Sequence, residues 1–314
     1  MNTTPGLALP CRLGTYSTGE DAWVDLAESI SWAIQGQTRS GKSVSTYVLL
    51  SALAHRLDCL VAGLDPSGIL LHAFDGHPRP DLRHLFAESW AAAADTLERI
   101  VAEHDRRVHF LVDHDLEKLD RPTVEIPYIY VVLEEYPGAL DGAGDEDAAE
   151  GRKGPAQQRP RIQRYVSRLI REGQKTGVRV ILIAQRMEAS IVSGDTRSNI
   201  AGRITHRVDN NDSVKMLHPR AEAGAVDWVT GNSSPVIRPG LGLIQVPGFE
   251  GVRKFRADFM PYDRYLDVCR RGLEHQKEMV AANGLDWERV GHPDLFGPVN
   301  QYEEDWTDDQ AAAS

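Results

Sequence analysis

The residues best suited to chemistry form one short stretch, residues 36–43, with the sequence G-Q-T-R-S-G-K-S. It matches the G-x-x-x-x-G-K-[ST] pattern of the Walker A loop. In such a loop, backbone N–H groups surround the phosphates, the lysine contacts the β- and γ-phosphates, and the hydroxyl ligates Mg²⁺. The pattern therefore predicts ATP and Mg²⁺ as cofactors, with Ser43 on the metal. The predicted nucleotide-binding residues are Gly36, Gln37, Thr38, Arg39, Ser40, Gly41, Lys42, Ser43 and Val44.

Two adjacent acids form a second candidate group. An apolar, β-branched run over residues 126–133 ends in Glu134 and Glu135, which predicts both carboxylates at the end of a buried strand. A nucleotide hydrolase needs one carboxylate that supports Mg²⁺ and another that orients or deprotonates the attacking water. We predict Glu134 for the metal and Glu135 for the water. The alternative is an acidic pair that only ends a strand at a solvated loop.

A polar amide, Gln185, follows a further apolar run over residues 178–184. If that run is a strand between the strands of the Walker A loop and of the glutamate pair, Gln185 can hydrogen-bond the γ-phosphate or the attacking water. Otherwise it is an ordinary loop residue. The predicted catalytic residues are Glu135, Lys42 and Gln185.

These residues need a scaffold, and the chain alternates between strand-like and helix-like segments. Strands are expected at 30–34, 57–65, 126–133, 178–184 and 202–208, and helices at 44–54, 88–111, 162–176 and 212–217. The alternation predicts an α/β fold with a mostly parallel central sheet. We expect it to end in a β-hairpin and a helix, over residues 240–246, 252–259 and 261–283.

Three parts are expected along the chain. Residues 1–29 form a hairpin or edge segment, residues 30–285 form one α/β domain, and residues 286–314 form an acidic, flexible tail. Within the domain, residues 141–160 have the composition of a flexible loop, rich first in Gly, Ala and acids and then in Arg, Gln and Pro.

Composition limits the class of protein. Hydrophobic residues make up 41% of the 314 residues and charged residues 26%, as in ordinary globular proteins. No run approaches the roughly 20 apolar residues of a membrane span, so we expect no intrinsic membrane segment. The N-terminus lacks the pattern of a signal peptide, and three scattered cysteines give no disulfide framework. We therefore expect a cytoplasmic location.

Positive charge is concentrated in residues 152–179, although the whole chain has a net charge of −11. This segment contains nine basic residues and one acid, and a helix there would bury its apolar face and turn the arginines outward. Such a surface suits sequence-independent contact with DNA phosphates. We predict DNA binding by Arg159, Arg161 and Arg164. The alternative is a solvated helix face.

Taken in order, these blocks resemble the motor domain of the FtsK/SpoIIIE family of DNA translocases. The matching blocks are residues 36–43, 64–66, 131–135, 184–186 and 198–204, followed by Val208, Asp212 and Ser213. The resemblance covers residues 10–260 and implies a RecA-like P-loop ATPase core. It also implies a homo-oligomeric ring, usually a hexamer, that pulls double-stranded DNA through its pore using ATP. An arginine from a neighbouring subunit would complete the site, with Arg161, Arg197 and Arg203 as candidates.

The chain departs from the family pattern at three positions, where Arg39 replaces Gly, Ser67 replaces Lys and Glu134 replaces Asp. Its single-domain form resembles the small translocases of actinobacterial plasmids and integrative elements, which transfer DNA between cells, or phage-encoded relatives. A membrane or DNA-recruiting partner protein is then expected. Two alternatives remain open, namely a DNA packaging or conjugation coupling ATPase and a non-hydrolysing nucleotide-binding adaptor.

Overall fold

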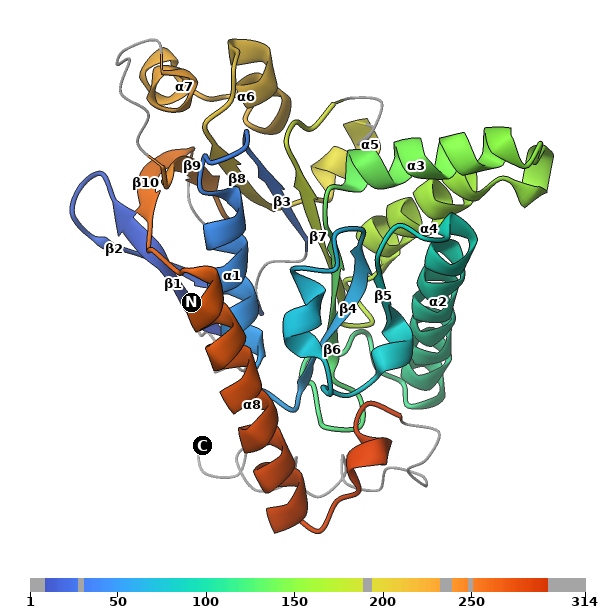
Figure 1. The fold of residues 1–314 in the computed structure, drawn as a ribbon. Helices are drawn as coiled ribbons and strands as arrows, with labels where there is room; N and C mark the ends of the chain where they lie inside the picture. The colour runs from blue at the N-terminus through green and yellow to red at the C-terminus, as the bar shows by residue number, and fades with distance from the viewer. Residues whose placement is uncertain (1–8, 28–30, 189–193, 232–238, 248–250, 293–314) are drawn as a thin grey trace.

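The computed structural model describes residues 9–27, 31–188, 194–231, 239–247 and 251–292 (Figure 1). The predicted acidic tail from residue 293 onward and the first residue of the strand predicted at 30–34 lie outside these ranges. The strands are β1 (Pro10–Tyr16), β2 (Asp21–Asp25), β3 (Trp32–Gln35), β4 (Cys59–Asp65), β5 (Arg83–Leu85), β6 (Tyr128–Leu133), β7 (Val178–Ala184), β8 (Gly202–His206), β9 (Leu241–Gln245) and β10 (Arg253–Ala257). The α-helices are α1 (Lys42–Leu53), α2 (Trp90–Asp113), α3 (Tyr136–Ala149), α4 (Gln158–Glu172), α5 (Gly194–Ser198), α6 (Asn211–Leu217), α7 (Ala223–Thr230) and α8 (Tyr262–Ala282).

The strands form one ten-stranded sheet in the order β2-β1-β10-β9-β8-β3-β7-β6-β4-β5. From β8 to β5 each neighbouring pair is parallel, whereas the pairs from β8 to β2 are antiparallel. The predicted α/β fold with a mostly parallel sheet is therefore confirmed. Because the carboxyl ends of parallel strands meet at one edge of a sheet, the residues that follow β3, β4, β6 and β7 lie together.

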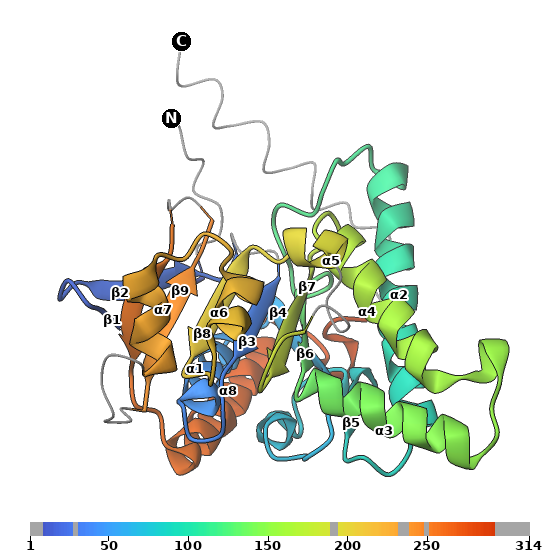
Figure 2. The ribbon, with the colours of Figure 1, turned by 90° about the horizontal axis from the view of Figure 1, so that it is seen from above.

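The central strands are buried on both faces, so their side chains alternate between two cores. In β6, Tyr130 and Val132 pack in the core that contains residues of α1 and α8. The neighbours Ile129 and Val131 pack in the core built with α2, α3 and α4. In Figure 2 these three helices gather at one end of the molecule, and β1 and β2 lie at the other.

Within the described ranges, no helix combines the length and the apolar character that crossing a membrane requires.

The prediction of a flexible loop over residues 141–160 is wrong, because α3 occupies its first half. The small residues there serve close packing. A Cβ added at Gly142 would lie 2.6 Å from the ring of Trp90, and Ala143 is fully buried in the core shared with α2. Composition indicated disorder, whereas tertiary contact with α2 stabilises the helix.

The connection between α3 and α4 is held by a buried carboxylate. Asp147 accepts the N–H of Gln158 at 2.8 Å and the N–H of Arg159 at 3.1 Å. A side chain of one helix therefore caps the first N–H groups of the next, a contact that stabilises helix starts by about 1 kcal/mol. The segment predicted to be a flexible loop thus joins two helices through this carboxylate.

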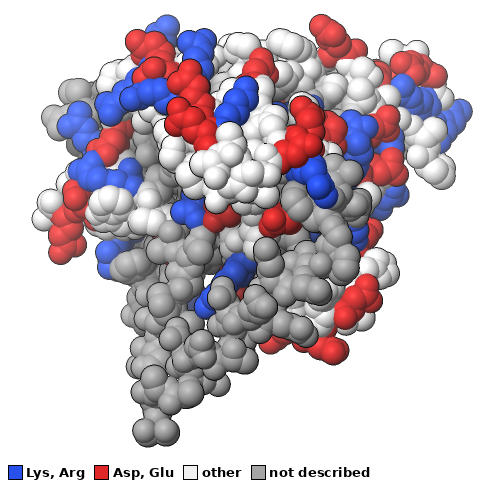
Figure 3. Space-filling view, turned by 90° about the horizontal axis from the view of Figure 1, so that it is seen from below, with Lys and Arg blue, Asp and Glu red and all other residues white. Residues whose placement is uncertain are grey.

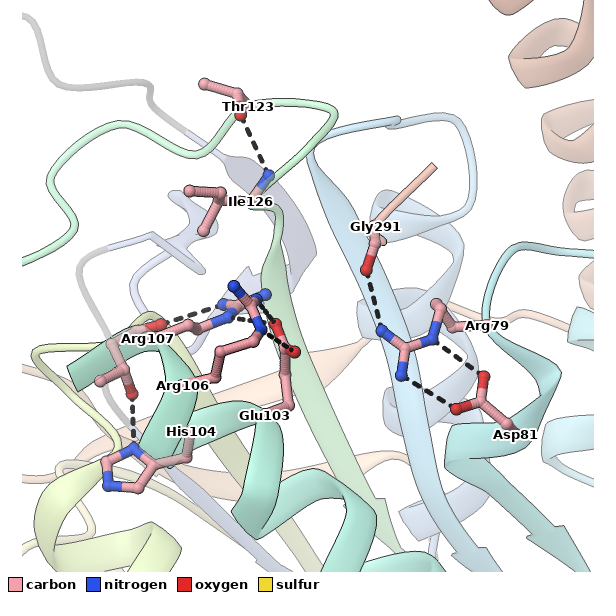
Figure 4. A network of polar contacts seen from close by, with 10 residues as sticks. Arg79, Asp81, Glu103, His104, Arg106, Arg107, Thr123, Ile126 and Gly291 are labelled. Atoms are coloured by element: carbon pink, nitrogen blue, oxygen red, sulfur yellow. Dashed lines mark hydrogen bonds and ion pairs between the residues drawn. The ribbon is translucent and has the colours of Figure 1, made fainter. Parts of the chain in front are cut away.

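A buried ion-pair network links α2 to Thr176, which precedes β7, and its residues on α2 are labelled in Figure 4. Glu103 accepts from Arg106 and from Arg107, and Arg107 donates to the Thr176 carbonyl at 3.0 Å. These contacts connect α2 to the segment before β7. Because Arg107 is almost fully buried, removal of Glu103 would leave a buried charge without its carboxylate partner. We assign this network to stability.

Candidate functional site

The Walker A loop joins the carboxyl end of β3 to the first turn of α1. Gly41 is the N-cap residue of this helix and has φ 112°. Because glycine has no side chain, it cannot cap the first N–H groups of the helix. The first N–H groups of a helix have no intrahelical acceptor, so this end suits an anion. A Cβ on Gly41 would lie 2.7 Å from the Gly240 nitrogen, so only glycine fits. The Gly240 N–H donates to the Ser40 carbonyl at 2.8 Å and fastens the loop to the turn before β9.

An ion pair crosses the site between Lys42 and Glu135. The Lys42 Nζ lies 3.0 Å from the Glu135 Oε2, and only 12% of the lysine side chain is exposed. The other carboxylate oxygen of Glu135 accepts the backbone N–H of Gln185 at 3.3 Å. The fold thus brings into one contact network the three residues predicted to be catalytic, from α1, the end of β6 and the end of β7.

Two site residues have backbone conformations that normally favour glycine. Glu135 has φ 43° and Arg39 has φ 64°, both in the left-handed region. This conformation costs an ordinary residue about 1 kcal/mol, which explains why the family pattern has glycine at the position of Arg39. At Glu135 the strained turn aims the carboxylate at Lys42, an arrangement typical of residues held for chemistry.

Glu134 lies beside Ser43 in a cavity of about 240 Å³ that Lys42 also lines. Burial, and then the negative charge of Asp65, raise the pKa of Glu134 to about 7, while Lys42 acts in the opposite direction. A bound divalent cation would favour the ionised carboxylate.

The residues fit the predicted Mg²⁺, because a serine hydroxyl and a carboxylate are oxygen donors of the kind that this ion prefers. In the described part of the chain, no cluster of three His, Cys, Asp or Glu side chains could hold a metal. Phosphate oxygens and water would therefore have to supply the other ligands, as in nucleotide sites generally.

Gln185 stands where the sequence analysis required it. Gln185 follows strand β7, which lies between β3 of the Walker A loop and β6 of the glutamate pair. This is the strand order that the predicted sensor role requires. The residue is exposed at the carboxyl edge of the sheet. Its role toward a γ-phosphate stays a prediction.

The sequence analysis missed Gln35, the fully buried last residue of β3. Its Nε2 donates to the Ser213 carbonyl at 2.7 Å, and its Oε1 accepts the N–H of Met187 at 3.0 Å. The side chain therefore ties the strand before the Walker A loop to the segment after β7 and to α6. The sequence contained a signal for this role, namely a polar residue at the end of an apolar strand. A buried amide needs hydrogen-bond partners, so such a residue indicates a tertiary contact.

Asp65, which lies in the family block 64–66, shapes the wall of the cavity that Ser43 and Glu134 line. Its buried carboxylate accepts the N–H groups of Ser67, Gly68 and Leu71 at 2.8 to 3.1 Å. These bonds fold the segment after β4 back beside Glu134. The order Asp-Pro-Ser-Gly is typical of a side-chain-capped turn and was the signal in the sequence.

Two of the three arginines predicted to bind DNA have carboxylate partners within the chain. Arg159 pairs with Asp141 of α3 at 3.2 Å, and Arg161 pairs with Glu98 and, at 2.8 Å, with Asp95 of α2. Carboxylates of neighbouring helices therefore offset part of the positive charge of Arg159 and Arg161. On the face drawn in Figure 3, basic and acidic side chains are likewise interspersed.

Arg164 differs from these two arginines. It is exposed, and its guanidinium lies 5.3 Å from the centre of the neutral Tyr165 ring. The ring has no net charge, so this contact does not offset the positive charge of Arg164. DNA binding by Arg159, Arg161 and Arg164 stays a prediction, and the geometry favours Arg164 among them.

The candidates for an arginine acting on a neighbouring subunit also have contacts within their own chain. Arg203 donates to the carbonyls of Ile200, Arg197 and Leu217 at 2.7 to 2.9 Å, which is a structural use of its guanidinium. Arg197 donates to the Met216 carbonyl at 3.1 Å. The role in trans remains a prediction for both, as for Arg161.

Comparison with known sequences finds proteins named DNA translocase FtsK. The protein of Staphylococcus aureus (strain Mu50) is 26% identical over 291 residues, which cover 86% of this chain and 33% of the relative. The protein of Listeria monocytogenes is 24% identical over 299 residues, which cover 88% and 36%. The chain spans about a third of the length of these relatives. No family model matches it. The resemblance to FtsK translocases inferred from the sequence is confirmed.

Solved structures agree in fold. The conjugation coupling protein TcpA of pCW3, in its monomer form with ATPγS, aligns with a TM-score of 0.65 at 20% identity, over 87% of this chain and 71% of that one. ATPases 2 and 3 of EssC from Geobacillus thermodenitrificans align with a TM-score of 0.64 at 15% identity, over 90% and 51%. The expected RecA-like P-loop ATPase fold is confirmed.

Proposed function

We propose that this chain, a relative of the FtsK DNA translocases, is an ATPase that moves double-stranded DNA. The observation that carries the proposal is the contact network of Lys42, Glu135 and Gln185 next to Glu134 and Ser43. A phosphate-binding lysine, a carboxylate for the attacking water and a polar sensor meet at one edge of the sheet. Nucleotide hydrolysis needs these groups together.

In this proposal Lys42 and the first N–H groups of α1 bind the phosphates, and Ser43 and Glu134 hold Mg²⁺. The metal would neutralise developing charge on the phosphate oxygens. Glu135 orients the attacking water and accepts its proton. Because Lys42 now pairs with Glu135, a phosphate that attracts the lysine would also release the carboxylate for this task. The backbone N–H of Gln185 contacts Glu135, and in this proposal its side-chain amide contacts the same water or the γ-phosphate.

We further propose a homo-oligomeric ring, a hexamer as in the family, that works on double-stranded DNA in the cytoplasm. Transfer of a mobile genetic element between cells, with a membrane or DNA-recruiting protein as partner, belongs to the proposal and is supported by the likeness in fold to the conjugation coupling protein TcpA. An arginine of the neighbouring subunit would complete each site. The alternatives are a packaging or conjugation coupling ATPase and a non-hydrolysing adaptor.

Steady-state ATP turnover with and without linear duplex DNA tests the proposal. A DNA-driven motor should hydrolyse ATP slowly alone and several-fold faster with duplex, because DNA binding and hydrolysis are coupled. Turnover in both conditions at the level of a Glu135→Gln control would instead favour the adaptor. Displacement of a triplex-forming strand by the wild type then separates a translocase from an ATPase that only binds DNA.

The salt dependence of duplex binding tests the predicted DNA contacts. Replacing Arg164 with alanine should flatten the slope of log affinity against log salt by about 0.9, because one phosphate contact is lost. The matched control is Arg168→Ala on the same helix, which is not among the predicted DNA contacts. Its guanidinium pairs with Asp105 and Glu172, so its loss should leave the slope nearly unchanged. An unchanged slope for Arg164→Ala would mean that this helix does not contact the DNA.

A further inference from the structure

A second cavity adjoins the Walker A loop, and Glu134 is not among the residues that line it. It has a volume of about 520 Å³. Residues of the Walker A loop and α1, of β1, of the turn before β9, and of β10 with the segment after it form its wall. These are Thr15, Gly41, Val44, Pro239, Gly240, Arg256, Ala257, Asp258 and Phe259.

The two cavities are lined by different residues of the loop and of α1, which defines a direction along the loop. Lys42 and Ser43 line the smaller one together with Glu134, so the γ-phosphate end of a nucleotide belongs there. Gly41 and Val44 line the larger one. In Figure 1 the end of β10 lies beside α1 at this side. A nucleotide whose phosphates lie along the loop would therefore extend its sugar and base toward β10.

Backbone hydrogen bonds hold this wall in place. The Gly240 N–H donates to the carbonyl of Ser40 in the Walker A loop, and the Ala257 N–H donates to the Gly240 carbonyl, both at 2.8 Å. The Asp258 N–H donates to the Leu13 carbonyl of β1 at 2.8 Å. The segment that carries Phe259 is thus fastened to the phosphate-binding loop itself. The cavity is preorganised by backbone contacts rather than by flexible side chains.

Phe259 is the unusual feature of this wall. Its side chain is 78% exposed, more than any other large hydrophobic side chain in the described residues. An exposed phenylalanine ring has a free apolar face that can pack against a ligand. An aromatic ring at the mouth of a cavity of this size, with the aliphatic Val44 in the same wall, matches the flat apolar faces of a purine.

We propose that this cavity is the base-binding subsite for ATP and that the purine ring stacks on Phe259. The inference rests on the proposed function, since it concerns the same nucleotide, and it assigns the base to residues outside the Walker A loop. Asp258 at the edge of the cavity is held by Arg12, so the polar rim is fixed. Phe259 is a binding residue for the base and takes no part in hydrolysis.

The test compares a ligand with a base and one without. Calorimetry measures the binding of ATPγS and of inorganic tripolyphosphate, each with Mg²⁺, to the whole chain. Phe259→Ala should weaken ATPγS binding about tenfold, in the range of base–aromatic stacking, and leave tripolyphosphate affinity unchanged. Phe259→Trp should retain ATPγS affinity, and the fluorescence of the new indole should be quenched by ATPγS only.

The control is Trp23→Ala, which removes another exposed aromatic side chain, on the edge strand β2, and should change neither affinity. Unchanged ATPγS binding by Phe259→Ala would overturn the subsite. Weaker binding of both ligands would also overturn it, because the effect would then lie on the phosphates. A change in oligomeric state without a change in affinity would place Phe259 in a subunit contact. Failure of the wild type to bind ATPγS would refute the proposed function itself.

Discussion

Replacing Lys42 with alanine is expected to reduce ATP turnover by about 10² to 10³-fold, because the site loses the side-chain cation that stabilises phosphate charge. The folded state should persist, since Lys42 lies at the start of α1 and its side chain pairs with Glu135 rather than joining a hydrophobic core. Steady-state turnover and circular dichroism of the same preparation measure both effects.

The matched control is Lys175→Ala, which removes an exposed lysine outside the site and should leave turnover unchanged. Turnover of Lys42→Ala within a few-fold of the wild type would refute the assignment of this loop to catalysis. A loss of helical signal at 25 °C would instead mean that the ion pair with Glu135 stabilises the fold.

Replacing Glu135 with glutamine should lower turnover by about 10² to 10⁴-fold, the usual contribution of a general base, while ATP still binds. The glutamine keeps the size of the side chain and removes its ability to accept a proton. Single-turnover kinetics should therefore show ATP bound and not cleaved. Retention of turnover would mean that another group orients the water.

Glu134→Gln provides the contrast. It should weaken the dependence of nucleotide binding on Mg²⁺, because an anionic oxygen ligand is lost. Its effect on stability should depend on pH. The pKa of Glu134 is raised from 4.5 to about 7, so between these values the unfolded chain loses the proton that the folded chain keeps. Ionisation of Glu134 thus destabilises the metal-free protein increasingly as pH rises to about 7.

Thermal unfolding without nucleotide or metal measures this effect. The Glu134→Gln protein should have a higher Tm than the wild type at pH 8, and the difference should shrink as pH falls toward 5. An equal difference at both pH values would contradict the raised pKa. Identical profiles of the Glu134 and Glu135 variants, in Mg²⁺ dependence and in stability, would mean that their separate roles are misassigned.

Local pattern was enough to predict the scaffold. Buried parallel strands are continuous apolar runs, so β6 and β7 stand out in the sequence, and β7 was predicted with the bounds that it has. The Walker A loop was equally plain, because the glycines and the lysine that a phosphate requires lie within eight consecutive residues. Where the chemistry depends on neighbours in sequence, the residue types alone identify it.

Local pattern failed where stability or charge depends on residues distant in sequence. Residues 141–149 have the composition of a loop, yet packing against α2 makes them helical. The charges of Arg159 and Arg161 count as basic in a sequence window, yet carboxylates of α2 and α3 offset them. A window of sequence contains neither the partner helix nor its charges, so no local rule could have found them.

The amino-acid sequence by itself determined which chemical groups the site contains. These are the phosphate-binding loop, the glutamate pair and the side-chain amide of Gln185, which follows β7. Only the tertiary structure decided how they are used. The strand order places β7 between β3 and β6, which brings Gln185 to Glu135 and Glu135 to Lys42. It also brings the turn before β9 onto the loop and Phe259 beside it. Side chains act through distances of a few ångströms, and residues far apart in sequence reach such distances only when the sheet has formed.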